Sequence, residues 1–112
     1  IVLGHSGCGG VQGCLDMCSG HAPHLEERSS FVGRWMDILR PGYDRVMTAQ
    51  PKDAASALEK EAVLVSLTNL MSFPFVKDAV DGGTLSLHGL WTDIGAGGLE
   101  QWDARTADFV PV

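Results

Sequence analysis

The first ten residues constrain the fold more than any other part of the sequence. Residues 1–4, IVLG, form a short and wholly apolar run, which is typical of a strand buried in a parallel sheet. Gly7, Gly9 and Gly10 then permit a tight turn and a close approach of the backbone, before a helix that we expect to begin near Val11. Open α/β sheets bind their ligands outside the carboxyl ends of the strands. This turn is therefore where we expect a functional site.

The middle of the chain predicts helices that are delimited by prolines. Residues 24–39 carry apolar side chains along one stripe, which predicts a helix that ends at the Pro-Gly pair of residues 41–42. The Pro-Lys-Asp sequence of residues 51–53 suits the start of a longer helix, since proline and an acidic side chain both favour the N-terminal end. That helix is apolar nearly all round over residues 62–71, which predicts burial on several sides or in a subunit interface. Pro74 interrupts it.

The C-terminal third predicts strands joined by glycine turns. Polar or small and apolar residues alternate over residues 84–90, which predicts a strand with Leu85 and Leu87 on one face. A glycine turn follows, and residues 99–103 are predicted to return as an antiparallel strand. The order of elements predicts an α/β fold with a mostly parallel sheet, flanking helices and an antiparallel edge strand. Because Ile1 begins inside a predicted strand, we expect the N-terminal part to be missing and residues 1–112 to be the C-terminal portion of a single domain.

Composition narrows the class of partner and the compartment. The 112 residues carry a formal net charge of −6, which argues against a nucleic-acid binder because such proteins need a basic face. No apolar run has the length needed to cross a bilayer, so we expect no membrane partner. Cys8, Cys14 and Cys18 fall within eleven residues. This odd and tight cluster favours a reducing compartment or metal chemistry over a disulfide framework, and we expect a cytoplasmic protein.

His5 and Cys8 lie three positions apart on the glycine turn. Such a turn can direct an imidazole nitrogen and a thiolate sulfur at one point, and both are good zinc donors. The alternative is a buried cysteine near a histidine that bonds to the backbone, which is the commoner situation for an arbitrary H-x-x-C pair. Two donors do not complete a zinc site. The spacing alone therefore leaves both interpretations open.

Other catalytic motifs can be tested on the same residues. A nucleophile elbow, G-x-S-x-G after a strand, would make Ser6 the nucleophile of an α/β-hydrolase-type esterase, although Cys8 replaces the last glycine. Acid and base partners exist in the required order, as Asp81 with His88 or Asp16 with His21. A dinucleotide fingerprint and a Walker loop both lack required residues. The metal interpretation fits best, and the esterase stays an alternative.

An ordered series of motifs covers nearly all of the chain. Residues 4–11, GHSGCGGV, resemble the second zinc motif of the β-carbonic anhydrases, in which the His and Cys of H-x-x-C bind the metal. Further blocks keep the family's order and roughly its spacing: E-x-V-x-x-S-L-x-N-L from Glu61, P-x-V from Pro74, G-x-L-x-L-H-G from Gly83, D-I-x-x-G from Asp93 and F-V-P from Phe109. The series as a whole is far more specific than any single block.

The resemblance implies a β-carbonic-anhydrase-like fold and a zinc-dependent lyase that interconverts carbon dioxide and bicarbonate. It implies that His5 and Cys8 are zinc ligands, and that Gly9 and Gly10 form the turn whose backbone borders the substrate pocket. The family's other cysteine ligand and its catalytic aspartate–arginine pair lie upstream in C-x-D-x-R, which occurs nowhere in these residues. We therefore expect this piece alone to be inactive, and the intact protein to form homodimers or higher assemblies. A zinc-free regulatory or binding module with the same fold is the non-enzymatic alternative.

For the remaining cysteine, histidine, tryptophan and charged residues we expect structural and not catalytic roles. Cys14 and Cys18 share a helix face and are expected to be small buried residues, with a thiol metal site or redox pair as the alternative. His88 is expected to lie on a strand and to pack or form a hydrogen bond locally. Core or interface anchors are expected at three tryptophans, Trp35, Trp91 and Trp102. A solvated helix edge is expected at three charged residues, Glu59, Lys60 and Glu61.

Overall fold

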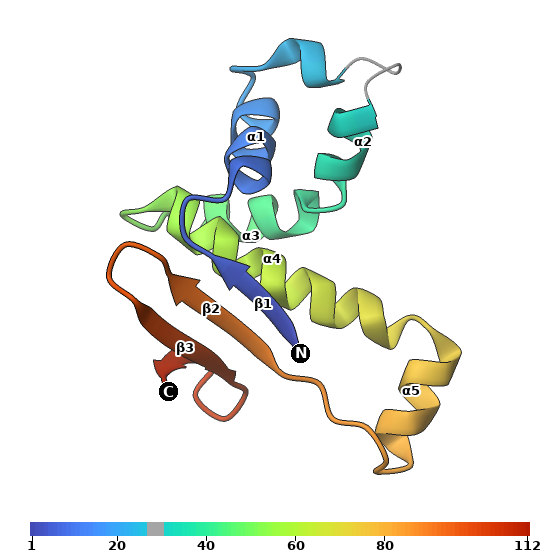
Figure 1. Cartoon of the computed structure of the whole chain (residues 1–112). Helices are drawn as coiled ribbons and strands as arrows, with labels where there is room; N and C mark the ends of the chain where they lie inside the picture. Colours follow the sequence, from blue (N-terminus) through green and yellow to red (C-terminus); the bar gives the residue numbers. More distant parts are fainter. Residues whose placement is uncertain (27–30) are drawn as a thin grey trace. The chain divides into compact units, whose positions relative to one another are not determined.

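The computed structural model describes residues 1–26 and 31–112. These residues form two compact units, one made of Ile1–Ser6 with Val63–Val112 and the other of Gly7–Ala62. The helix α4 (Ala54–Met71) contributes residues to both. Figure 1 shows the helices and strands of each unit along the chain.

The first unit contains a four-stranded sheet in the order β1-β2-β3-β4 (Figure 1). Its strands are β1 (Val2–His5), β2 (Gly89–Asp93), β3 (Gly98–Asp103) and β4 (Asp108–Pro111). β1 pairs with β2 in parallel, whereas β2 with β3 and β3 with β4 are antiparallel. The α/β class is confirmed, and the sheet is mixed. Its antiparallel part is larger than a single edge strand because the last three strands are joined by short turns, which only antiparallel neighbours permit.

The sheet of the first unit buries one face against α4. Val63, Trp91 and Phe109 form the core of this unit, with exposed fractions of 2%, 6% and 8%. Trp102 packs against this core, and its ring centroid lies 5.5 Å from that of Phe109. The prediction that Trp91 and Trp102 anchor a core is therefore confirmed.

The strand predicted over residues 84–90 begins later than expected, at Gly89. The backbone at residues 84 and 85 caps a helix instead of joining the sheet. The N–H groups of Thr84 and Leu85 both donate to the carbonyl oxygen of Ala79, at the end of α5 (Pro74–Asp81). His88 consequently precedes the strand, and its Nε2 lies 2.8 Å from Ser86 Oγ. The local hydrogen bond expected for His88 is present, but its place on a strand was wrong.

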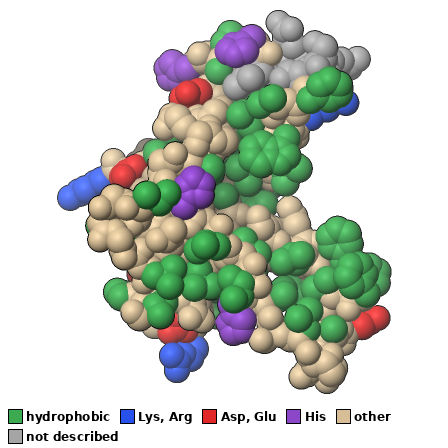
Figure 2. All heavy atoms as spheres, viewed as in Figure 1, with side chains coloured by type: hydrophobic (Ala, Val, Ile, Leu, Met, Phe, Trp, Pro, Cys, Tyr) green, Lys and Arg blue, Asp and Glu red, His purple; other side chains and the backbone are tan. Residues whose placement is uncertain are grey.

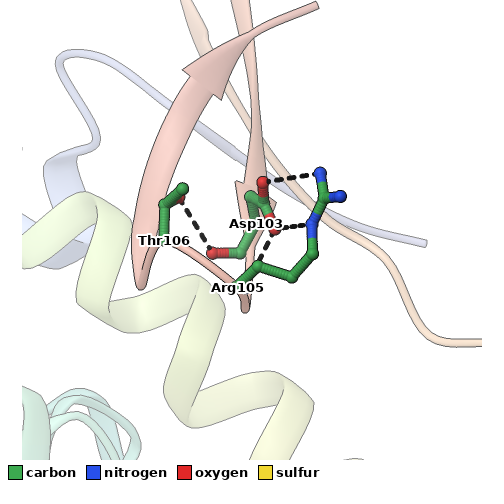
Figure 3. Close-up of polar contacts among 3 residues, drawn as sticks. All are labelled: Asp103, Arg105 and Thr106. Carbon is green, nitrogen blue, oxygen red and sulfur yellow. Dashed lines mark hydrogen bonds and ion pairs between the residues drawn. The ribbon is translucent and has the colours of Figure 1, made fainter.

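The turn between β3 and β4 is closed by an aspartate and an arginine (Figure 3). Arg105 donates from its backbone N and from Nε to Asp103 Oδ1, at 2.9 and 3.2 Å, and from Nη2 to Oδ2 at 3.1 Å. Thr106 Oγ1 also donates to the Asp103 carbonyl oxygen. The side-chain hydrogen bond from Arg105 lowers the pKa of Asp103 below its usual value. This turn fixes the hairpin that carries Trp102 and Phe109.

The second unit is helical. It contains α1 (Gly9–Cys18), the 3-10 helix η1 (Pro23–Glu26), α2 (Phe31–Asp37), α3 (Arg40–Ala49) and the first part of α4. The buried residues of its core are Val11, Cys14, Met17, Met36, Val46 and Leu58. Close packing is possible because small residues face large ones. A methyl group added at Gly13 would clash with the end of the Met36 side chain.

The helix predicted over residues 24–39 is seen in part among the described residues. Residues 23–26 and 31–37 are helical, and the stretch of the prediction at 27–30 lies outside the described residues. Pro41 was predicted to end a helix, but it lies in the first turn of α3. The physical reason is that proline lacks only an N–H group that has no partner at a helix start, so it begins helices as readily as it ends them.

The boundaries of α4 agree with the signals from Asp53 and Pro74, whereas Pro51 lies before the helix and not in its first turn. Asp53 Oδ1 accepts the N–H of Ser56 at 3.1 Å and so satisfies a group at the helix start. The helix ends at Met71, and Pro74 begins α5. None of the described helices is by itself long and apolar enough to span a membrane. The bent pair α4 and α5, at 91°, meets the criteria of length and composition only when taken together.

Large apolar side chains remain exposed on each unit. On α2, Phe31 is 82% exposed and Trp35 is 58% exposed, because this short helix buries only Gly33 and Met36. Phe75 of α5 is 73% exposed. Figure 2 shows hydrophobic side chains gathered on the viewed face of the molecule. The prediction of a core position for Trp35 was therefore wrong, although an interface position stays a prediction.

Candidate metal site

His5 is the last residue of β1 and lies opposite Thr92 of β2 in the parallel register. Its side chain is exposed, and its ring is held by a short local bond. Nδ1–H donates to the carbonyl oxygen of Ser6 at 2.9 Å. A histidine that ligates a metal usually donates its other ring N–H in this way, which fixes the tautomer. The remaining nitrogen, Nε2, is then the one available to a metal ion.

Ser6 fastens the end of β1 to the turn between β2 and β3. Its N–H donates to the Thr92 carbonyl oxygen at 2.9 Å, and its Oγ accepts the N–H of Ile94 at 2.9 Å. Asp93 completes this arrangement, since its Oδ1 lies 3.4 Å from Ser6 Oγ and also accepts the N–H groups of Gly95 and Ala96. The residue whose carbonyl holds the His5 ring is thus fixed on both sides. Sequence reasoning noticed the D-I-x-x-G block but not this role.

The esterase alternative receives no support from these contacts. The hydrogen bonds found for Ser6 Oγ go to Asp93 and Ile94, and both are explained by turn formation. The histidines proposed as its base bond elsewhere in the described structure. His88 contacts Ser86 and His21 contacts Ser19, at 2.8 and 2.7 Å.

Cys8 belongs to the helical unit and is the N-cap residue of α1. Its thiol is free, half-buried and packed against the core of that unit. Gly7 before it has a φ of +67°, a left-handed conformation that glycine adopts without strain.

The two glycines after Cys8 have different surroundings. A methyl group added at Gly9 would have no described atom within 4 Å, whereas one at Gly10 would lie 2.7 Å from the Trp35 ring. The backbone is therefore open at Gly9 and covered by an indole at Gly10. The expectation that both border a substrate pocket stays a prediction.

Glu59 contradicts the expected solvated edge of α4. It is only 5% exposed, and its Oε1 accepts the N–H of Gly7 at 2.8 Å and that of Cys8 at 3.3 Å. A buried carboxylate requires such partners, because an unpaired one would be very costly to bury. Glu61 lies nearer the surface and pairs with Arg45 at 2.8 Å. Charge alone suggested solvation for both, and no local sequence signal separates the buried Glu59 from Glu61.

The donors present fit part of a zinc site. Imidazole and thiolate are the ligand types that zinc prefers, and the His5 tautomer suits metal binding. The described residues contain no group of three His, Cys, Asp or Glu side chains that would hold a metal. His5 and Cys8 belong to different compact units, although only two residues separate them in the chain. Their joint action on one metal ion stays a prediction.

Cys14 and Cys18 form a separate thiol pair, with their sulfurs 4.0 Å apart. Cys14 is fully buried, which confirms the structural interpretation for it. Burial, and next the neighbouring Cys18, raise the pKa of the Cys14 thiol from 9.0 to about 12. A thiol that keeps its proton at neutral pH is a poor metal ligand and a poor nucleophile.

This raised pKa predicts a loss of stability in alkali. Between 9.0 and about 12 the unfolded chain releases the Cys14 proton while the folded chain retains it. The free energy of unfolding is therefore expected to fall as the pH rises through this range, and to show no contribution from Cys14 below it. Urea midpoints measured below and above the lower pKa would test this, with Cys14→Ala as the control. The same alkaline slope in that variant would contradict the assignment.

Comparison with known proteins agrees with the fold and with the motifs. The family model for carbonic anhydrase matches residues 1–99. The chain is 34% identical over 107 residues to Beta carbonic anhydrase 3 of Arabidopsis thaliana, and the match covers 92% of this chain and 40% of that protein. It is also similar to the solved structure of the beta-carbonic anhydrase CcaA, with a TM-score of 0.84, 28% identity, and coverage of 98% of this chain and 49% of that one. The chain thus spans half or less of the length of these relatives. It belongs to the β-carbonic anhydrase family.

Proposed function

We propose that the protein carries out zinc-dependent, reversible hydration of carbon dioxide to bicarbonate and a proton, with His5 Nε2 and Cys8 Sγ as two of the zinc ligands. Family membership supports the reaction. The single observation that most supports the ligand assignment is the bond from His5 Nδ1–H to the Ser6 carbonyl, which leaves the opposite ring nitrogen for a metal.

Each residue of the glycine turn has a distinct part in this proposal. Zinc, when bound, supplies the Lewis acidity that makes water a usable nucleophile near neutral pH. His5 contributes a neutral imidazole whose tautomer is set by Ser6, and Cys8 contributes a sulfur from the start of α1. The open backbone at Gly9 leaves room for a small substrate beside the turn.

The rest of the coordination sphere would come from residues outside this chain. The described part contains no third donor grouped with others for a metal, and the chain covers 40% of its Arabidopsis relative. We propose that a further cysteine ligand and the aspartate–arginine pair lie in a preceding C-x-D-x-R segment. The exposed apolar side chains of α2 and α5 support assembly into a homodimer or a higher oligomer.

Two samples test the proposal. One is the whole protein including the residues that precede this chain, and the other is the chain of residues 1–112 alone. We expect the whole protein to bind zinc stoichiometrically and to hydrate carbon dioxide, and the shorter chain to do neither at a comparable level, because two donors do not hold zinc firmly. Metal analysis, stopped-flow hydration assays and sedimentation of the same samples measure these properties.

Two results would overturn the proposal. A whole protein that is folded, free of zinc and inactive would favour the regulatory module. Stoichiometric zinc and rapid turnover in residues 1–112 alone would show that the ligand set lies within this chain.

A further inference from the structure

Glu59 makes the most unusual polar contact in the helical unit. Its charged side chain is buried, at 5% exposure, and it follows the fully buried Leu58 in the sequence. One oxygen, Oε1, accepts two consecutive backbone N–H groups, from Gly7 at 2.8 Å and from Cys8 at 3.3 Å. Hydrogen bonds to an ionised acceptor are stronger than those between neutral groups. The carboxylate therefore holds two successive peptide groups firmly, the one before Gly7 and the one between Gly7 and Cys8.

Neither the glycine turn nor the first turn of α1 supplies a side-chain acceptor that could replace Glu59. Helix α1 has no side-chain hydrogen bond at its N-cap and no acidic residue in its first turn. The N–H of the N-cap residue is one of the groups that a helix leaves without an internal partner. The acceptor for Cys8 comes instead from a residue 51 positions along the chain. A distant buried carboxylate thus accepts the N-cap N–H, as the glutamate at the third helical position does in a capping box.

We propose that Glu59 is a positioning residue for the Cys8 sulfur, and this inference rests on the proposed function. The sulfur is attached through Cβ to the Cα of Cys8, and Glu59 holds the backbone nitrogen of the same residue, so the carboxylate limits where the thiolate lies relative to the body of α4. Residues that orient a metal ligand affect metal binding even though they do not touch the metal. Glu59 acts on the thiolate through the backbone, whereas most such partners act through the ligand side chain.

Zinc release from the whole protein distinguishes this role from plain anchoring of α4. In Glu59→Ala we expect release to a chromophoric chelator to be faster by about 10-fold or more, as for other outer-shell partners. Glu59→Gln keeps an acceptor oxygen at the same reach and should restore most of the wild-type rate. In the cobalt-substituted protein, the sulfur-to-metal charge-transfer band should shift in the Ala variant and recover in the Gln variant.

The matched control is Glu61→Ala, which removes a carboxylate two residues further along α4 together with its pair to Arg45. It should leave the release rate and the cobalt spectrum unchanged. If Glu59→Ala does not fold, Glu59→Asp serves in its place, because it keeps the charge but is too short by one methylene group to reach both N–H groups. Hydrogen exchange at the Gly7 and Cys8 amides in the zinc-free protein gives a readout that needs no metal, and it should accelerate in the Ala and Asp variants.

The outcomes separate this inference from the proposed function. Wild-type zinc release and cobalt spectrum in a folded Glu59→Ala or Glu59→Asp variant would overturn it, and so would equal effects of Glu59→Ala and Glu61→Ala. In both cases the proposed function would stand if Cys8→Ser still lost its zinc. A wild-type whole protein that binds no zinc would overturn both proposals.

Discussion

Replacing Cys8 by serine is expected to leave the whole protein without zinc and to lower its rate of carbon dioxide hydration by more than about 100-fold, the upper range of losses for an outer-shell partner. A ligand should matter more than the groups that orient it. Serine is nearly the same size and keeps the N–H that donates to Glu59, so the backbone of the turn is preserved. Its hydroxyl group, however, keeps its proton at neutral pH and does not replace a thiolate on zinc. Metal analysis and stopped-flow assays measure both effects.

Cys18→Ser is the matched control for this variant. Cys18 is also half-buried on α1, and it lies beside the Cys14 sulfur instead of in the glycine turn. We expect it to keep its zinc and its activity. If Cys8→Ser retained stoichiometric zinc, or if the two serine variants lost it equally, the assignment of Cys8 as a ligand would have to be abandoned.

Gly89→Ala is expected to destabilise the chain by about 1–3 kcal/mol, the usual cost of overpacking a well-filled core. Gly89 is buried in β2, directly beneath the part of α4 that covers the sheet. A methyl group there would lie 2.8 Å from Val63 Cγ1 and 2.9 Å from Leu67 Cδ1. Val63 is 2% exposed and β-branched, so it has little freedom to move aside. Urea unfolding followed by tryptophan fluorescence measures the loss, because the buried Trp91 belongs to the same core.

The control for the glycine in β2 is a glycine in the neighbouring strand. An added methyl group at Gly98 of β3 would have no described atom within 4 Å. Gly98→Ala should therefore change the free energy of unfolding by no more than about 0.5 kcal/mol, as is usual for exposed positions. Equal losses in the two variants would show that close packing between β2 and α4 is not what restricts residue 89.

Local sequence signals predicted the parts of this fold that depend on local chemistry. The apolar run at residues 1–4 was predicted as a buried strand, and residues 2–5 do form β1 in parallel with β2, but the burial was predicted wrongly because Leu3 is 59% exposed. Asp53 caps the start of α4, as the capping rules require. Pro41 and residues 84–88 were predicted wrongly for one shared reason. A proline or glycine indicates that a helix or strand begins or ends nearby. Which of the two happens depends on which backbone N–H and C=O groups find hydrogen-bond partners.

The candidate site was less predictable than the fold around it. His5 and Cys8 were identifiable by residue type and spacing, and the series of family motifs identified the pair as candidate zinc ligands. The supporting residues were not identifiable, because Glu59 and Asp93 act on a turn more than 50 positions away. A charged residue on a helix is usually solvated, and only the tertiary structure shows that this carboxylate is buried against backbone N–H groups.

The fastening of Ser6 to the turn after β2 restricts how this protein can change in length. Hairpin turns usually accept added residues readily, because their tips contact little else. The turn at residues 93–98 is different, since Ile94 and Asp93 must reach the serine that follows His5. Insertions at that tip would shift the histidine, whereas the self-contained Asp103–Arg105 turn can be lengthened without reaching it. Natural variation in loop size, and any tag or domain inserted by design, should therefore be accommodated in the hairpin between β3 and β4.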